Sequence, residues 1–138
     1  MSDQIKFHIG LHVSNIESTV SFYEKLFRSA PVKVKSDYAK FELENPGLVI
    51  SFMESKKSVK PEFGHLGLRV ATSEMLQERK VEVEQHLTIQ LEEENTSCCY
   101  ARQDKFWVND PDGYEWEVYH FKEDVESSEK QFQAAPCC

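Results

Sequence analysis

One motif, His-x-Gly-Leu-x-Val, occurs twice in this chain, at residues 8–13 and again at residues 65–70. A motif that recurs in this way indicates two copies of one supersecondary unit. Each copy has the alternation of a strand, and each places a histidine, His8 or His65, at the equivalent position. If the two units pack symmetrically, these histidines converge, and converging histidines indicate a metal site.

The residues that follow each copy show the same order of strand, helix-cap and turn signals. In the first module, about residues 5–54, the expected strands are 5–13, 32–35, 38–43 and 48–54, and the helix is about 16–28, capped by Ser14 or Asn15. In the second module, about residues 63–121, the expected strands are 64–71, 88–92, 99–108 and 114–121, and the helix is about 74–86, capped by Thr72 or Ser73. The sequence therefore predicts an α+β fold made of two βαβββ modules.

The size and charge of the chain limit what it can do. Its 138 residues are those of a single domain with a real core. The net charge of −8 disfavours nucleic acid and anionic membrane surfaces as partners. No apolar run approaches the roughly 20 residues of a membrane span, and the N-terminus lacks a signal peptide pattern. We therefore expect a cytoplasmic protein of one domain, residues 1–138, in which the polar residues 122–138 form a flexible tail.

The four cysteines form two adjacent pairs, Cys98-Cys99 and Cys137-Cys138. Adjacent Cα atoms lie about 3.8 Å apart, which is below the disulfide range, so each pair is expected to stay reduced. Residues 95–97, Asn-Thr-Ser, predict a turn, which would put Cys98 and Cys99 at a loop-to-strand junction. There, both thiolates could bind one soft ion such as As(III), Cd(II) or Zn(II). A pair of half-buried thiols without a ligand fits the dipeptide equally well.

Strand alternation indicates which side chains share a surface with the two histidines. His8 and His65 fall on the strand faces opposite the apolar residues that the helices cover. On the last strand Glu117 alternates with Trp116 and Val118, so it is also expected on the face away from the helix. A carboxylate on an enclosed face is costly unless it is paired or binds a cation.

Two histidines and one carboxylate match the facial triad of non-haem Fe(II) oxygenases, which leaves coordination positions open for substrate and O₂. Aligning the turn glycines Gly47 and Gly113 makes Ser51 the equivalent of Glu117 in the first module. A serine is a weak ligand, so the predicted site stays open. The alternative is that His8 and His65 are ordinary buried histidines.

The repeated motif and the ending Asp-Pro-Asp-Gly-x-x-Trp-Glu-Val at residues 110–118 resemble the vicinal-oxygen-chelate superfamily. That superfamily includes glyoxalase I, bleomycin-resistance and fosfomycin-resistance proteins, and extradiol dioxygenases. The resemblance covers about residues 5–121 and implies two βαβββ modules that form an open cupped β-barrel around a metal. The metal ligands of the superfamily carry over onto His8, His65 and Glu117.

A narrower resemblance, carried by residues 31–35, 38–41 and 94–108, is to the branch of organoarsenical carbon–arsenic lyases and cadmium-induced proteins. It implies an Fe(II)- and O₂-dependent, dioxygenase-like lyase that cleaves the C–As bond of trivalent organoarsenicals and releases arsenite. The expected substrates are methylarsonous acid and aromatic arsenicals. In this interpretation Cys98 and Cys99 bind the arsenic, and a homodimer is one arrangement that the branch allows. The other expected substrate-pocket residues are Tyr100, Gln103 and Lys105.

Two alternative functions fit the same residues. One is another metal-dependent enzyme of the glyoxalase or thiol-transferase type, although such sites use more ligands than Ser51 would provide. The other is a resistance protein that binds Cd(II) or As(III) through Cys98 and Cys99 without catalysis. The complete set of His8, His65 and Glu117 argues against a protein that only sequesters ions.

Overall fold

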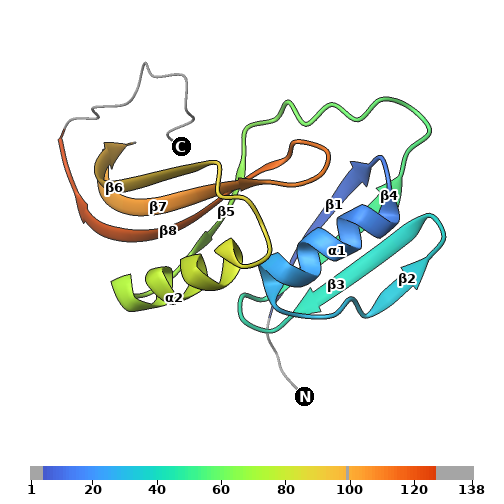
Figure 1. The fold of residues 1–138 in the computed structure, drawn as a ribbon, viewed down its shortest axis with the longest axis horizontal. Coiled ribbons are helices and arrows are strands. Elements are labelled where there is room, and N and C mark those ends of the chain that lie inside the picture. The colour runs from blue at the N-terminus through green and yellow to red at the C-terminus, as the bar shows by residue number, and fades with distance from the viewer. Residues whose placement is uncertain (1–4, 99, 127–138) are drawn as a thin grey trace. The chain divides into compact units, whose positions relative to one another are not determined.

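The computed structural model describes residues 5–98 and 100–126, which belong to two compact units, Met1–Lys60 and Pro61–Cys138. The elements of the first unit are β1 (Phe7–Val13), α1 (Ile16–Phe27), β2 (Lys33–Lys35), β3 (Tyr38–Leu43) and β4 (Leu48–Glu54). Its sheet has the strand order β1-β4-β3-β2 (Figure 1). The β1 and β4 strands are parallel, and the other neighbouring pairs are antiparallel.

The first unit is held together by an aromatic core between α1 and the sheet. Asn15 starts the helix, because its side chain accepts a hydrogen bond from the backbone N–H of Ser18 at 2.8 Å. The ring of Tyr23 packs 4.4 Å from that of Phe52 and 6.4 Å from that of Phe41, and all three side chains are fully buried. These contacts fix α1 on one face of the sheet and leave the other face to His8.

The second unit repeats this architecture. Its elements are β5 (Leu66–Arg69), α2 (Ser73–Glu84), β6 (Leu91–Cys98), β7 (Ala101–Asn109) and β8 (Glu115–Asp124). Its sheet has the order β5-β8-β7-β6, with β5 parallel to β8 (Figure 1). The predicted α+β class and the two βαβββ modules are therefore confirmed. Of the described helices, none has the length and apolar character needed to cross a bilayer.

Helix α2 and the turn before β8 form as the sequence predicts. Thr72 caps α2 by accepting a hydrogen bond from the backbone N–H of Met75 at 3.1 Å. The Asp110 carboxylate accepts hydrogen bonds from the N–H groups of Asp112 and Tyr114, at 2.8 and 2.9 Å. Gly113 completes this turn with a φ of 92°, which favours glycine. The turn reverses the chain so that β8 can pair with β7.

The prediction of a turn at residues 95–97 was wrong, because these residues belong to β6. The register between β6 and β7 shifts between Glu93 and Thr96, and Asn95 has a φ of 51°. Such a bulge accommodates a turn-type residue within a strand. The strands are then joined between Cys98 and Ala101, so β6 is longer and β7 starts later than expected.

The predicted tail also starts too early. β8 continues to Asp124, whose register partner on β7 is Ala101. Backbone hydrogen bonding extends the strand even though residues 122–124 are charged and exposed. The rest of the predicted tail, residues 127–138 with Cys137 and Cys138, lies outside the described residues.

Candidate functional site

The second unit brings together His65 and Glu117, two of the three predicted metal ligands. The Nε2 atom of His65 lies 3.5 Å from Oε1 of Glu117, and both side chains are largely buried. The His65 ring packs edge-on against Trp107, with ring centroids 5.0 Å apart. Within the described residues, Nδ1 of His65 is buried and has no hydrogen-bond partner. The imidazole is therefore oriented by packing, with Nε2 toward the carboxylate.

Gly67 provides the space that the Glu117 side chain occupies. The two residues are register partners in the parallel pair of β5 and β8. A Cβ atom on Gly67 would lie 2.9 Å from Cγ of Glu117 and 3.3 Å from its Oε1. A larger residue at position 67 would therefore displace the carboxylate that faces His65.

A buried lysine holds the other oxygen of the same carboxylate. Lys105, on β7, is only 2% exposed, and its Nζ donates a hydrogen bond to Oε2 of Glu117 at 2.9 Å. The ammonium also lies 5.6 and 5.7 Å from the ring centroids of Trp107 and Tyr119. The opposite charge of Lys105 offsets the cost of burying the Glu117 carboxylate.

The first unit contains the equivalent site with a different residue. Ser51 is the register partner of Gly10, as Glu117 is of Gly67, which confirms that the two positions are equivalent. Nε2 of His8 lies 3.5 Å from Oγ of Ser51. His8 thus has a hydroxyl neighbour where His65 has a carboxylate.

The donor atoms of the second unit fit a bound divalent metal. Two ligand atoms on one metal, each at about 2.0–2.2 Å from it, lie roughly 3.0–3.4 Å apart. The 3.5 Å between His65 Nε2 and Glu117 Oε1 is close to that spacing. Within either unit, the described residues gather no three His, Cys, Asp or Glu side chains around one point. The role of His8 as a third ligand therefore stays a prediction.

The predicted substrate residues begin at the junction of β6 and β7. Cys98 ends β6, and its backbone is the register partner of Ala101; Cys99 lies outside the described residues. Tyr100 is 57% exposed and has a φ of 62°. Gln103 is buried, while Lys105 reaches Glu117. Lys105 therefore contacts a predicted metal ligand directly.

Trp107, the register partner of Glu117, was not predicted from the sequence as a site residue. Trp107 packs on His65, and its Nε1 donates a hydrogen bond at 3.3 Å to Oε1 of the buried Glu93. Trp107 and Lys105 are two residues apart on β7, so they share a strand face, and Trp107 is the register partner of Glu117. Alternation along β7 was the signal that could have placed both beside the carboxylate.

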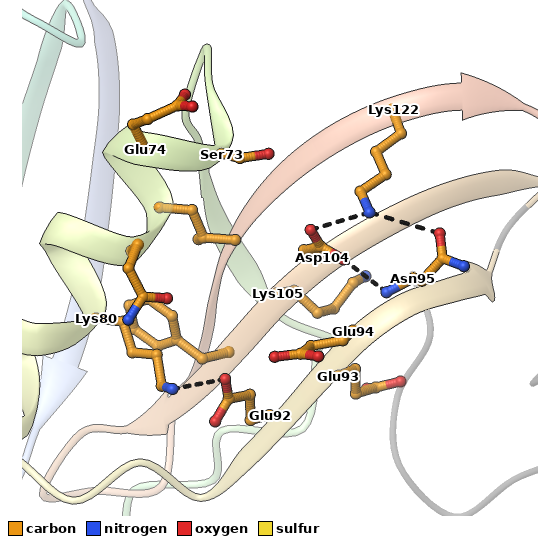
Figure 2. Close-up of a pocket in the computed structure, with 13 residues that line it drawn as sticks. Ser73, Glu74, Lys80, Glu92, Glu93, Glu94, Asn95, Asp104, Lys105 and Lys122 are labelled. Carbon is orange, nitrogen blue, oxygen red and sulfur yellow. Dashed lines mark hydrogen bonds and ion pairs between the residues drawn. The ribbon is translucent and has the colours of Figure 1, made fainter.

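A cavity of about 490 Å³ lies between α2 and strands β6 and β7 (Figure 2). Charged pairs surround it: Lys80 contacts Glu92 at 2.6 Å, and Lys122 contacts Asp104 at 3.1 Å. Asp104 and Phe106 line this cavity and alternate along β7 with the residues of the Glu117 face. Lys105, which holds Oε2 of Glu117, also lines this cavity, whereas His65 and Glu117 are not among its lining residues.

The profile of the Glyoxalase/Bleomycin resistance protein/Dioxygenase superfamily matches residues 7–118. The chain belongs to this superfamily. One solved superfamily structure, a glyoxalase/bleomycin resistance protein/dioxygenase from Alicyclobacillus acidocaldarius, superposes with a TM-score of 0.71 at 12% identity. The superposition covers 86% of this chain and 92% of that one, and it supports the fold alone.

Two curated superfamily relatives are more similar in sequence. A trivalent organoarsenical cleaving enzyme of Bacillus sp. (strain MD1) is 45% identical over 132 residues, which are 95% of this chain and 81% of the relative. The cadmium-induced protein CadI of Mycobacterium tuberculosis is 33% identical over 119 residues, which are 86% of this chain and 78% of the relative. Both relatives align over most of the two modules.

Proposed function

We propose that this protein is an enzyme that cleaves the carbon–arsenic bond of trivalent organoarsenicals and releases arsenite. The observation that carries the proposal is the 45% identity, over 95% of this chain, to a trivalent organoarsenical cleaving enzyme. The adjacent Cys98 and Cys99 add a chemical reason, because vicinal thiolates suit a thiophilic As(III) centre. Methylarsonous acid and aromatic arsenicals are the proposed substrates.

In this proposal His8, His65 and Glu117 hold a divalent metal, Fe(II). The spacing of His65 Nε2 and Glu117 Oε1 and the absence of a carboxylate at Ser51 support an open site of this kind. Fe(II) bound there would supply the activation of O₂, which is the oxidant for cleavage of the C–As bond. Trp107 packs on the His65 ring and keeps Nε2 directed toward the Glu117 carboxylate.

The cysteines have a positioning role in the proposed reaction. The thiols of Cys98 and Cys99 would replace the two hydroxyl groups of the trivalent arsenic, forming two As–S bonds and releasing two waters, and this would fix the organic group relative to the metal ligands. Tyr100 and Gln103 follow the pair in sequence and are proposed to line the substrate pocket. The exposed Tyr100 side chain is free to cover a bound arsenical.

A second function is favoured by the similarity to a cadmium-induced protein. The chain would then bind Cd(II) or As(III) through Cys98 and Cys99 without turnover. The buried His65–Glu117 pair favours the enzyme, because a protein that only sequesters soft ions needs no such pair.

The deciding experiment measures arsenite release from methylarsonous acid by Fe(II)-loaded protein, with and without O₂. We expect O₂-dependent release that Glu117→Gln abolishes and that the double variant Cys98→Ser/Cys99→Ser reduces strongly. The double variant Cys137→Ser/Cys138→Ser is the matched control and should retain turnover. Unchanged turnover after Cys98 and Cys99 are replaced would exclude their role. Tight Cd(II) binding without any arsenite release would instead support the sequestering function.

A further inference from the structure

The two oxygens of the Glu117 carboxylate have different neighbours. Oε1 lies 3.5 Å from Nε2 of His65, while Oε2 accepts a hydrogen bond from Nζ of Lys105 at 2.9 Å. Lys105 therefore engages Oε2, and Oε1 faces His65. Which carboxylate oxygen is available to a cation is determined by Lys105.

The position of Lys105 is itself well defined. Its side chain is about 1% exposed, and the ammonium lies 5.6 and 5.7 Å from the rings of Trp107 and Tyr119. Trp107 and Tyr119 come from the adjacent strands β7 and β8, and Tyr119 is the register partner of Lys105. A lysine that is buried between two rings has few alternative rotamers, so its hydrogen bond orients Glu117 rather than following it.

We propose that Lys105 is a positioning residue for Glu117, holding Oε2 so that the carboxylate binds the metal through Oε1 alone. This inference rests on the metal site proposed above, and it replaces the predicted contact of Lys105 with substrate. One carboxylate oxygen can accept from an ammonium while the other binds a metal. Partners of this kind orient a ligand and are usually needed for full metal affinity.

Single-oxygen binding by Glu117 has a consequence for the proposed reaction. A carboxylate that bound through both oxygens would occupy one more coordination position. By engaging Oε2, Lys105 keeps that position available for substrate or O₂. In the first module, Ser51 also leaves a coordination position available, because it supplies no carboxylate.

The test uses Co(II) as the probe and measures its affinity and visible absorption spectrum in the full chain without substrate. Lys105→Met removes the hydrogen-bond donor at nearly constant volume, and we expect affinity to fall by about 10–100-fold. At saturating Co(II), the absorption bands of this variant should also change, because Glu117 can then bind through both oxygens. Lys105→Arg retains a charged donor and should restore most of the affinity.

Lys80→Met is the matched control, because Lys80 also pairs with a glutamate, Glu92 at 2.6 Å, but from α2. It should leave Co(II) affinity and spectrum unchanged. If Lys105→Met does not fold, Lys105→Gln is judged by the same criteria. Affinity and spectrum equal to those of the unsubstituted chain, or tighter binding, would overturn the positioning role.

The same measurements distinguish an error in the proposed metal site from an error in the role of Lys105. If the metal site is wrong, the unsubstituted chain would bind no Co(II), or Glu117→Gln would bind it equally well. Either result would overturn the site itself and the role of Lys105 with it. A purely structural role for Lys105 would lower the thermal stability of the metal-free protein and leave the Co(II) spectrum unchanged.

Discussion

Gly67 lies directly opposite Glu117 in the parallel pair of β5 and β8, and the glycine leaves the space that the carboxylate fills. In the first module the same positions are occupied by Gly10 and Ser51. A Cβ on Gly10 would lie 3.7 Å from Oγ of Ser51, an ordinary contact, whereas one on Gly67 would lie 2.9 Å from Cγ of Glu117. The two repeats therefore contain a natural matched pair of glycines.

Gly67→Ala should displace Glu117 and weaken metal binding by about tenfold or more, since the added methyl overlaps the side chain of a proposed ligand. Overpacking should also lower the free energy of unfolding by about 1–3 kcal/mol. Gly10→Ala is the control and should leave metal affinity close to that of the unsubstituted chain. Co(II) titration and thermal unfolding measure both effects. Equal metal affinities for the two variants would contradict the steric argument.

Ser51→Glu should place a second carboxylate next to His8, because Oγ of Ser51 lies 3.5 Å from Nε2 of His8. In the proposed reaction the added ligand would fill a coordination position intended for substrate or O₂, so we expect tighter metal binding and much slower release of arsenite. The metal-free variant should be less stable, since position 51 is only 6% exposed and a buried carboxylate needs a partner. Ser51→Ala is the control. Metal affinity that does not increase would show that position 51 does not reach the site.

Asp104→Ala should loosen the bulge that precedes the cysteine pair. Oδ1 of Asp104 accepts a hydrogen bond from the backbone N–H of Asn95 at 2.6 Å, and Lys122 contacts Oδ2 at 3.1 Å (Figure 2). Loss of both contacts should reduce the free energy of unfolding by about 1–2 kcal/mol. Glu123→Gln removes a more exposed ion pair, to Arg102 at 3.2 Å, and should cost less than about 1 kcal/mol. Urea unfolding of both variants gives the comparison, and equal losses would argue against a special role for the bulge.

Because of the ion pair between Lys6 and Glu42, the free energy of unfolding should depend slightly on pH, and this dependence should weaken with salt. The hydrogen bond from Lys6, 2.9 Å in length, lowers the pKa of Glu42 below its ordinary value in the folded protein. The folded state therefore binds the proton of Glu42 less readily than the unfolded chain does. The stabilisation is complete above the ordinary pKa of a glutamate and is lost as the pH falls through the lowered pKa.

Glu42→Gln should flatten the acid side of a plot of the urea unfolding midpoint against pH. High salt should reduce the difference from the unsubstituted chain, because the pair is exposed. Hydrogen bonds from Lys6 to Glu44 and Glu42 also raise the pKa of Lys6. The stabilisation from the charged Lys6 side chain is present at neutral pH and is lost as the pH rises through the raised pKa of Lys6. If the urea midpoint falls identically with decreasing pH in both proteins, Glu42 is not the source of the pH dependence.

Local features were predicted well because short-range physics determines them. Asn15 and Thr72 cap their helices, Asp110 and Gly113 build the predicted turn, and strands Tyr38–Leu43 and Leu48–Glu54 have the predicted bounds. The bulge at Asn95 and the continuation of β8 to Asp124 were missed. Both depend on hydrogen bonds to a neighbouring strand, and no local pattern records these.

The order of residues along the chain was enough to predict the two modules, the equivalence of His8 and His65, and the face of β8 that carries Glu117. Period-two alternation and an internal repeat are sufficient for these conclusions. The contact of Lys105 with one oxygen of Glu117, while His65 faces the other, became visible only in the folded protein. Such a contact depends on the register of β7 against β8, and register is set by the whole sheet rather than by any residue's own neighbours in the chain.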